Sequence, residues 1–233
     1  MIVALNNKCN LTHEEFIDYL TQLNKIDCQS KLILIPSFCN ISLANNCKFA
    51  LASQNISSRN NGAYTGEVSA QQLKSFHVKY TLVGHSERRE YQKETLTELN
   101  EKVKRAFENS IIPILCVGET KEERENNQVK EVIEKEITSA IKDLTEEKRK
   151  QLIIAYEPIW SIGTGIIPTI EEIEEVFNMI KTQLPTSKIL YGGSANEKNI
   201  SILKESKLID GYLLGGLSLK PKELTEFLTI LEN

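Results

Sequence analysis

Short apolar runs alternate with longer helical stretches eight times along the chain. Two of the runs, Leu-Ile-Leu-Ile at 32–35 and Leu-Ile-Ile-Ala at 152–155, are continuously apolar, which is typical of parallel strands that helices cover on both faces. The eight runs predict strands at 2–6, 31–35, 48–54, 80–84, 111–117, 151–156, 188–191 and 210–215. Because helices are expected between them, the predicted fold class is α/β.

Two helix starts are marked by capping boxes. Thr12 stands three positions before Glu15, and Ser69 stands three positions before Gln72; such pairs satisfy the first free N–H groups of a helix. Eight strand–helix units in 233 residues favour a closed (β/α)8 barrel, although a doubly wound open sheet has the same local pattern. No repeat, linker or low-complexity tract divides the chain, so we expect a single barrel domain over residues 1–233.

Composition and charge argue against several classes of partner. The chain is 40% hydrophobic and 26% charged, its net charge is −4, and it has no basic tract with interleaved aromatic residues that would attract nucleic acid. The longest apolar run, at 111–117, is far shorter than the roughly 18 residues of a membrane-spanning helix. The N-terminus has no signal-peptide pattern. We therefore expect neither a nucleic-acid nor a membrane partner, and a cytoplasmic location.

Neither a metal site nor a disulfide framework is indicated. The chain has five cysteines without a C-x-x-C pair and only three histidines, which disfavours structural zinc and paired cysteines. Two charged stretches, at 119–125 and 146–150, are interpreted as solvated helix ends.

Polar residues follow three predicted strands at the points where the strands end. Asn6-Asn7-Lys8 ends the first strand, Gly-His-Ser-Glu-Arg-Arg at 84–89 ends the fourth, and Tyr-Glu-Pro at 156–158 ends the sixth. Active sites of barrel enzymes lie on the loops that follow the strands, so these segments are the candidate site.

The seventh and eighth strands end in glycine-rich turns, Tyr-Gly-Gly-Ser at 191–194 and Leu-Gly-Gly-Leu at 214–217. Backbone N–H groups at such turns approach phosphate closely, so we expect a phosphate monoester as substrate. Glu157 is followed by a short apolar segment between Pro158 and Gly163, which is typical of a lid that excludes water from proton chemistry.

Three motifs together resemble the signatures of the triosephosphate isomerase family, in that family's chain order. They are Gly-His-Ser-Glu-Arg-Arg at 84–89, Ala-Tyr-Glu-Pro-Ile-Trp-Ser-Ile-Gly-Thr-Gly at 155–165 and Tyr-Gly-Gly-Ser at 191–194. The resemblance extends from Asn6 to Gly216 and includes Ser-Gln-Asn at 53–55 and Gly-Ala-Tyr-Thr-Gly-Glu at 62–67. It implies a TIM barrel that interconverts dihydroxyacetone phosphate and glyceraldehyde 3-phosphate, in glycolysis and gluconeogenesis, without a metal or organic cofactor.

The resemblance also assigns roles to four residues. Glu157 would abstract the substrate proton, as a carboxylate made a stronger base by desolvation under the closed lid. His85 would polarise the carbonyl as a neutral imidazole at a helix N-terminus. Lys8 would supply positive charge, and Asn6 would donate a hydrogen bond to a substrate oxygen.

Supporting roles are implied for Ser86, Glu87 and Cys116. The segment 86–89 is expected to open a helix, with the Ser86 N–H as partner of the His85 ring nitrogen that faces away from the substrate. Glu87 is either a carboxylate that contacts the reacting groups or a residue that only orients Lys8. Cys116 is expected to pack behind Glu157 rather than to act as a thiolate.

The implied phosphate-binding N–H groups are those of Gly163, Ser194, Gly215 and Gly216. A homodimer is also implied, because in the family the loop at 55–66 projects into a neighbouring subunit. Thr65 would then lie near the partner's first-strand loop, the one that carries Lys8.

Two segments depart from the family pattern. The first loop has Leu5, Asn7 and Cys9 where Gly, Trp and Met are usual, which changes the packing next to the expected dimer contact. After the lid, Ile166 stands where a lysine is usual, and Ile167 and Pro168 follow it. Pro168 restricts the backbone of the C-terminal hinge.

Two alternatives from other classes remain. A Schiff-base aldolase on the same fold would need a lysine on a barrel strand that faces the site, where the chain instead has Glu157 at a strand end. A non-catalytic barrel would be expected to lack an acid, a base or a phosphate-binding glycine, and this chain has all of them.

Overall fold

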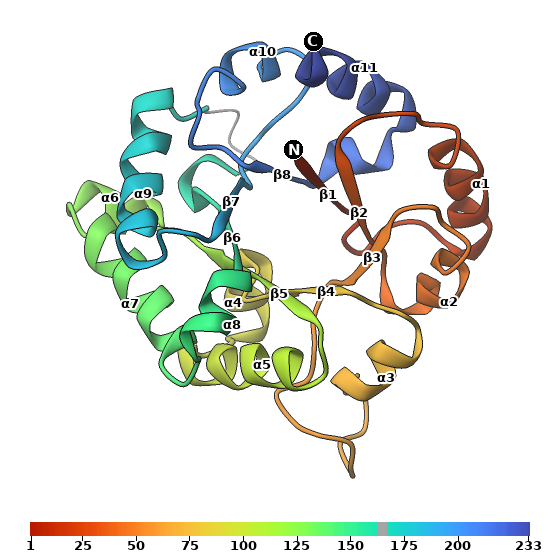
Figure 1. Cartoon of the computed structure of the whole chain (residues 1–233), viewed down its shortest axis with the longest axis horizontal. Helices are drawn as coiled ribbons and strands as arrows, with labels where there is room; N and C mark the ends of the chain where they lie inside the picture. The colour runs from red at the N-terminus through yellow and green to blue at the C-terminus, as the bar shows by residue number, and fades with distance from the viewer. Residues whose placement is uncertain (163–166) are drawn as a thin grey trace.

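A closed barrel of eight parallel strands forms the centre of the protein (Figure 1). The structure is a computed structural model that describes residues 1–162 and 167–233. Each strand pairs with its neighbours in sequence, and the first also pairs with the last, so the sheet has no free edge. The strands are β1 (Ile2–Asn6), β2 (Lys31–Ile35), β3 (Ala50–Ser53), β4 (Tyr80–Val83), β5 (Ile112–Val117), β6 (Ile153–Tyr156), β7 (Lys188–Tyr191) and β8 (Gly211–Leu214).

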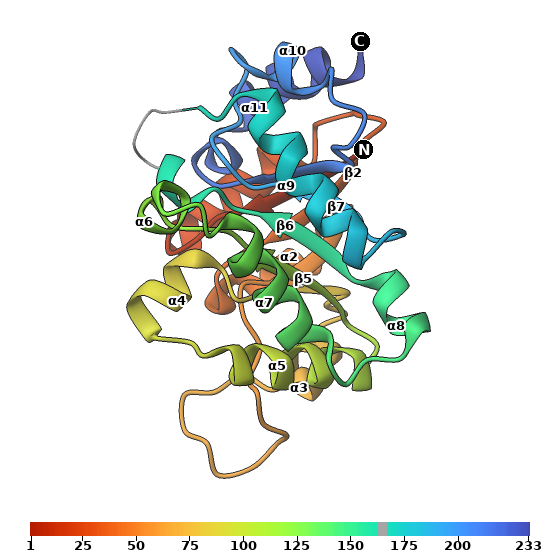
Figure 2. The same cartoon turned by 90° about the vertical axis from the view of Figure 1, so that its left-hand side faces the viewer.

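Helices surround the barrel on its outside (Figures 1 and 2). They are α1 (His13–Leu23), η1 (Phe38–Asn40), α2 (Ile41–Ala44), α3 (Ala70–Ser75), α4 (Ser86–Gln92), α5 (Leu96–Glu108), α6 (Lys121–Glu125), α7 (Val129–Ile141), α8 (Glu146–Gln151), η2 (Ile159–Ser161), α9 (Ile170–Gln183), α10 (Ile200–Leu203), η3 (Gly216–Leu219) and α11 (Pro221–Glu232). None of the helices within the described residues is long and apolar enough to cross a membrane.

The core has two layers that share the strands. Val3 and Leu5 belong to the large cluster between the strands and the surrounding helices, whereas Ile2 and Ala4 belong to a smaller cluster inside the barrel. Successive strand residues point to opposite faces, so both faces need apolar side chains. This explains the continuously apolar runs and confirms the predicted α/β barrel.

The predicted strands are all present, but several are shorter than expected. The first, second and seventh match in both bounds, and each of the others is one to three residues shorter than predicted. The predicted strand at 48–54 begins only at Ala50, where pairing with Ile33 starts; the Lys48 ammonium instead donates to the Ile26 carbonyl oxygen at 2.6 Å. Gln151, predicted to open the sixth strand, ends α8.

Both predicted capping boxes are confirmed. The Thr12 hydroxyl accepts from Glu15 N–H and the Ser69 hydroxyl accepts from Gln72 N–H, with the reciprocal bonds present. The same arrangement starts α5, α6 and α9, at Thr95, Thr120 and Thr169. These three boxes have the same Thr-x-x-Glu pattern, so they too are visible in the sequence.

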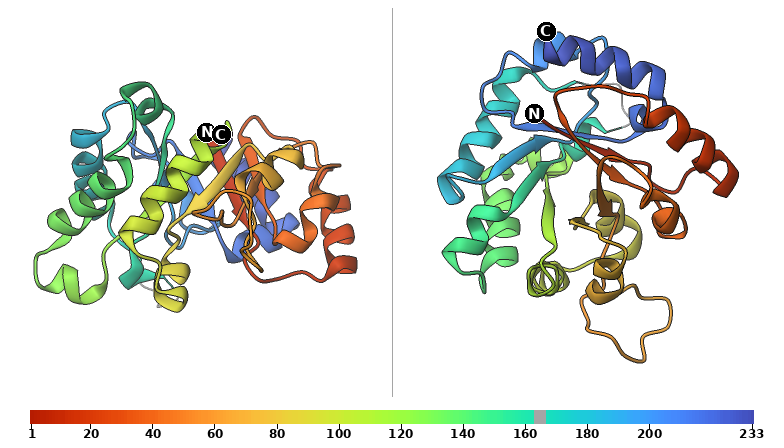
Figure 3. Two further views of the ribbon diagram at one scale, coloured as in Figure 1. Left: turned by 90° about the horizontal axis from the view of Figure 1, so that it is seen from below. Right: turned by 45° about the vertical axis from the view of Figure 1, so that its right-hand side comes forward.

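The segment between β3 and α3 projects from the barrel (Figures 1 and 3). Its residues 59–67 are all exposed. The base of the segment is closed by a bond from Ser57 N–H to the Val68 carbonyl oxygen at 2.9 Å. Near the tip, the Arg59 guanidinium lies over the Tyr64 ring at 4.8 Å.

Candidate active site

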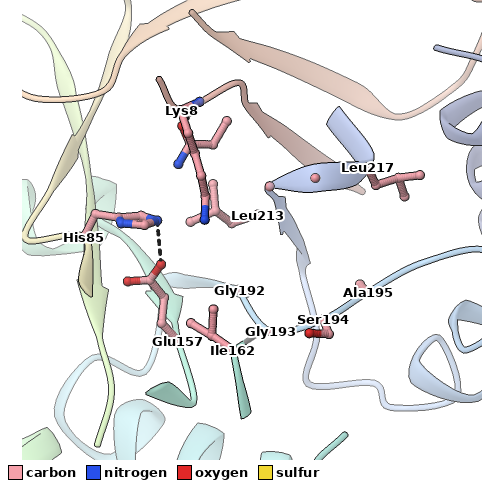
Figure 4. A pocket seen from close by; sticks show the side chains of 13 residues that line it. Lys8, His85, Glu157, Ile162, Gly192, Gly193, Ser194, Ala195, Leu213 and Leu217 are labelled. Carbon is pink, nitrogen blue, oxygen red and sulfur yellow. Dashed lines mark hydrogen bonds and ion pairs between the residues drawn. The ribbon is translucent and has the colours of Figure 1, made fainter. Parts of the chain in front are cut away.

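A cavity of about 260 Å³ opens where the barrel strands end. Residues that follow β1, β4, β6, β7 and β8 line it, so segments more than 200 positions apart in sequence meet there. The predicted site residues that line it are Asn6, Lys8, His85, Glu157, Ser194, Gly215 and Gly216. Figure 4 shows the Lys8, His85 and Glu157 side chains converging on the same space.

His85 and Glu157 are in direct contact on the cavity wall. The His85 Nε2 atom lies 3.0 Å from Glu157 Oε1, and Ser86 N–H donates to Glu157 Oε2 at 2.9 Å. Both side chains are almost fully buried, with 8% and 2% of their surface exposed. An acid–base pair is therefore held at one edge of a polar cavity.

The partner of the second His85 nitrogen differs from the one predicted. Nδ1 accepts from Glu87 N–H at 3.3 Å, whereas Ser86 N–H is bonded to Glu157. His85 is the N-cap of α4, and an N-cap acceptor reaches the N–H groups two or three residues on rather than the adjacent one. Because a nitrogen that accepts carries no proton, Nε2 holds the imidazole proton and donates it to Glu157.

The pKa values of the two groups depend on their contact. Burial alone lowers the pKa of His85, but the charge and hydrogen bond of Glu157 outweigh it and raise that pKa. Burial raises the pKa of Glu157, yet His85, Ser86 N–H and the Arg89 charge together lower it. These partners stabilise the ionised carboxylate, and the expectation that desolvation under the closed lid makes Glu157 a stronger base stays a prediction.

Lys8 is held in place from several sides. It adopts a left-handed backbone conformation, with φ of 52°, and its N–H donates to Asn6 Oδ1 at 3.1 Å. Its ammonium lies 2.6 Å from Glu87 Oε1. The Gln54 amide donates to the Lys8 carbonyl oxygen at 2.8 Å.

Glycines let the backbone approach the site closely. A Cβ atom on Gly215 would lie 3.1 Å from Lys8 Cε, and one on Gly192 would lie 3.0 Å from Glu157 Cγ. Ser194 and Gly216 also line the cavity. Gly163, predicted to bind phosphate from the lid, lies outside the described residues, as does Ile166 in the altered hinge.

Cys116 and Thr65 lie apart from the cavity. Cys116 is fully buried inside the barrel, and burial together with the charge and hydrogen bond of Glu157 raises the pKa of its thiol far above the ordinary value. A thiolate role is therefore disfavoured. Thr65 is in the exposed part of the projecting segment, where it lines a separate cavity.

The altered first loop has a polar contact where the family pattern has an indole. Asn7 is buried, and its amide donates to Tyr19 Oη at 3.4 Å and to Ser218 Oγ at 3.3 Å. The Ser218 hydroxyl in turn donates to the Asn6 carbonyl oxygen at 3.0 Å. This contact joins the Lys8 loop to η3.

Glu119 was wrongly interpreted as part of a solvated helix end. It is fully buried, and its Oε1 atom accepts from Trp160 Nε1 at 2.7 Å, from Tyr156 Oη at 3.0 Å and from Arg124 Nη1 at 2.8 Å. It therefore holds the start of the lid segment. Its position two residues after the end of β5 is the signal in the sequence. The stretch at 146–150 carries no buried residue, as expected.

The strands also bear on the aldolase alternative. Within the described strands, lysine occurs only as the first residue of β2 and of β7, Lys31 and Lys188. These positions lie at the opposite end of the barrel from the cavity, so neither lysine faces the site.

Comparison with known proteins shows the family to which the chain belongs. The family model described as Triosephosphate isomerase matches residues 1–233. Similar proteins named triosephosphate isomerase include those of Aspergillus oryzae (39% identical, 94% of each chain covered), Mycoplasmopsis pulmonis (39%, with 98% of this chain and 97% of the relative) and Mesomycoplasma hyorhinis (40%, with 98% of each). The chain belongs to the triosephosphate isomerase family and is an isomerase that interconverts dihydroxyacetone phosphate and glyceraldehyde 3-phosphate.

Proposed function

We propose that Glu157 is the base of this isomerisation and that His85 is its electrophile and proton shuttle. The reaction removes a proton next to a carbonyl and returns one to the neighbouring carbon. It therefore needs a carboxylate beside the carbon atoms and a proton donor beside the oxygen atoms. The observation that carries the proposal is the contact between His85 Nε2 and Glu157 Oε1, 3.0 Å apart on the cavity wall.

Substrate binding would activate Glu157 by separating it from its present donors. The bonds from His85 and Ser86 lower the pKa of Glu157. A substrate that takes the place of these donors leaves burial as the dominant influence, and burial raises the pKa of a carboxyl group. Glu157 then becomes a stronger base at the moment when a proton lies within its reach.

His85 would act as a neutral donor. Its Nδ1 atom is occupied by Glu87 N–H at the start of α4, which disfavours a second ring proton there. The Nε2 proton, freed from Glu157, would donate to the substrate carbonyl oxygen and stabilise the enediolate. The imidazole would then carry protons between the two substrate oxygens.

Lys8 and Asn6 would complete the charge stabilisation. The Lys8 ammonium lines the cavity beside the imidazole, where it offsets negative charge on the enediolate and phosphate. The Asn6 carbonyl group already accepts from Lys8 N–H, so its NH2 group is the part available to donate to a substrate oxygen. Glu87 would orient Lys8 through their ion pair.

The phosphate would bind at the glycine-rich side of the cavity. The proposed donors are the N–H groups of Gly163, Ser194, Gly215 and Gly216. Support comes from the position of the last three on the cavity wall, where Figure 4 shows Ser194 on the side away from His85. Closure of the lid over the phosphate would keep the enediolate from eliminating it.

We test these roles with a coupled assay in both reaction directions. Glu157→Gln is expected to lose at least about a thousandfold in kcat, because it removes the principal proton-transfer group, and His85→Gln is expected to lose a large part of the activity as well. Glu226→Gln, an exposed position on α11, serves as the matched control and should retain full activity. Normal turnover by Glu157→Gln would refute the proposed mechanism.

A homodimer and a cytoplasmic location belong to the same proposal. The projecting segment with Thr65 would insert beside Lys8 of a second copy, where a cavity of about 380 Å³ is lined by Cys9, Phe38 and Tyr91. Tyr91 leaves 68% of its surface exposed, which a partner would cover. The location follows from the place of the reaction in glycolysis.

Sedimentation equilibrium tests the dimer. The wild type is expected to have twice the chain mass, and Thr65→Arg is expected to shift it towards monomer because it places a bulky cation near Lys8 of the partner. A wild-type monomer with full activity would contradict the dimer proposal.

A further inference from the structure

A buried ion pair lies behind the His85–Glu157 contact and takes no part in the chemistry described above. Glu136 comes from the middle of α7 and is 8% exposed. Its Oε1 atom pairs with the Arg89 guanidinium, and its Oε2 atom accepts from Gly118 N–H at 2.9 Å. One carboxylate thus joins three elements: α4, α7 and the end of β5, with α4 and α7 on the same side of the barrel (Figure 2).

Each of the two contacts of Glu136 leads directly to a residue of the site. Arg89 is on α4, one turn after His85, and Arg89 N–H donates to the His85 carbonyl oxygen at 3.2 Å. Gly118 packs against the backbone of Glu157 so closely that a Cβ atom on it would lie 1.8 Å from the Glu157 carbonyl oxygen. The two oxygens of Glu136 therefore hold the segments that position the proposed acid and base.

The charge of Arg89 also reaches Glu157. It is one of the influences that lower the pKa of Glu157, and it acts through buried surroundings that screen charge weakly. Arg89 Nε and Nη2 are buried without a hydrogen-bond partner among the described residues. Glu136 is thus the anion that offsets this cation.

We propose that Glu136 is a positioning residue of the isomerase, which fixes the His85 and Glu157 segments through Arg89 and Gly118 and offsets the Arg89 charge beside Glu157. The inference rests on the roles proposed above for His85 and Glu157. Without the Glu136 charge, Arg89 would stabilise the Glu157 carboxylate more strongly and make it a weaker base.

The surroundings of Glu136 give this effect a pH dependence. Burial, together with a smaller effect of the nearby Glu123 on α6, raises the pKa of Glu136 to about 7 against the opposing effects of Arg89 and Gly118 N–H. Cys116 and Glu157 face Arg89 from β5 and from the end of β6. Glu136 therefore carries its charge mainly above neutral pH.

The test compares steady-state kinetics of the full chain between pH 4 and pH 9. At pH 8.5, Glu136→Gln is expected to lower kcat about tenfold with KM changed less than about threefold, as for a weakened base. At pH 6 the kcat deficit should shrink below about threefold, because Glu136 is then protonated in the wild type as well. Glu136→Asp, which keeps the charge, should recover part of the pH 8.5 deficit.

Two further variants separate this role from simple loss of structure. Glu134→Gln on the exposed face of α7, whose side chain is 46% exposed, is the matched control and should behave as the wild type. Arg89→Gln removes the cation and is expected to move the acid limb of kcat/KM to higher pH, whereas Glu136→Gln leaves that limb in place, because Glu136 is already protonated there in the wild type. The substrate phosphate titrates equally in all variants.

The proposal is overturned if the kcat ratio of wild type to Glu136→Gln is the same at every pH, or if only KM changes. If Glu136→Gln fails to fold, the Arg89→Gln profile decides alone, and an acid limb that stays in place or moves to lower pH refutes the inference. Failure here leaves the role of Glu157 intact, since that role is tested independently by Glu157→Gln.

Discussion

The bonds that keep the Glu157 carboxylate ionised also make it a weaker base. In the structure it accepts from His85 Nε2 and Ser86 N–H, and these bonds lower its pKa despite complete burial. A group that is ionised before substrate arrives needs no proton removed from it first. The same donors must then be given up to the substrate for Glu157 to gain basicity.

Glu136 leads to a prediction about stability that is independent of the kinetics. Its folded-state pKa of about 7 exceeds the ordinary value of 4.5, so the folded protein binds more protons between these values. The stabilisation is fully present below pH 4.5 and is lost as the pH rises through 7. Relative to Glu136→Gln, the wild type should lose about 3 kcal/mol of unfolding free energy between pH 4.5 and 8.

Urea unfolding at fixed protein concentration measures this difference at each pH. The variant is the reference because Gln cannot titrate, so all other ionisable groups cancel in the comparison. Parallel stability curves for the two proteins would contradict the assigned pKa of Glu136.

At the scale of elements, one buried carboxylate, Glu119, anchors the start of the lid segment. Trp160 in η2 and Tyr156 at the end of β6 both donate to the same oxygen of Glu119. The Arg124 guanidinium pairs with that oxygen and also lies over the Trp160 ring at 4.8 Å. The first residues of the lid segment are therefore fixed to the barrel through Glu119 and Arg124.

Replacing Glu119 is therefore expected to loosen this element. Glu119→Gln removes the charge from an acceptor of three donors, and we expect a loss of about 2 kcal/mol in unfolding free energy. Trp160 is the one tryptophan of the chain, so its emission reports on the anchor directly and should shift to longer wavelength. Glu122→Gln on the exposed side of α6 is the control, and equal spectra for both variants would refute the anchor.

Strand positions were easier to predict from sequence than strand ends. The strand β2 was predicted in both bounds, because its apolar run at 32–35 is flanked by Lys31 and Pro36. The start of β3 is instead set by hydrogen-bonded pairing with β2, because Ala50 is the first residue that pairs with that strand. Pairing depends on a neighbouring strand and leaves no mark in the local pattern.

At the scale of the whole molecule, closure of the barrel makes the site. Asn6 and Gly216 lie at opposite ends of the sequence and line one cavity because β1 pairs with β8. The site therefore depends on long-range contacts throughout the sheet. Any change that opens the barrel should remove activity and structure together.

The proposed dimer gives a prediction for the whole molecule. If the projecting segment inserts into a second copy, unfolding is coupled to dissociation, and the thermal midpoint should rise with protein concentration. Calorimetry over a hundredfold concentration range checks this, with Thr65→Arg as the variant in which the dependence should weaken. A midpoint that is independent of concentration in the wild type would speak against the dimer.

The sequence by itself determined the α/β class, the eight strands and the segments that form the site. Apolar runs must be buried between helices and barrel, and residues directly after parallel strands meet at one end of a barrel. Asn6, Lys8, His85 and Glu157 could therefore be placed at one site from their positions relative to the strands. The family resemblance added their chemistry.

Only the tertiary structure decided which partner each polar group has. Glu119 was interpreted as part of a solvated helix end and no sequence motif marked Glu136, yet both are buried because segments distant in the chain cover them. The same holds for the ring nitrogen of His85, which bonds Glu87 N–H rather than Ser86 N–H. The energy of a buried charge or hydrogen bond depends on the three-dimensional surroundings, which no local pattern of residues records.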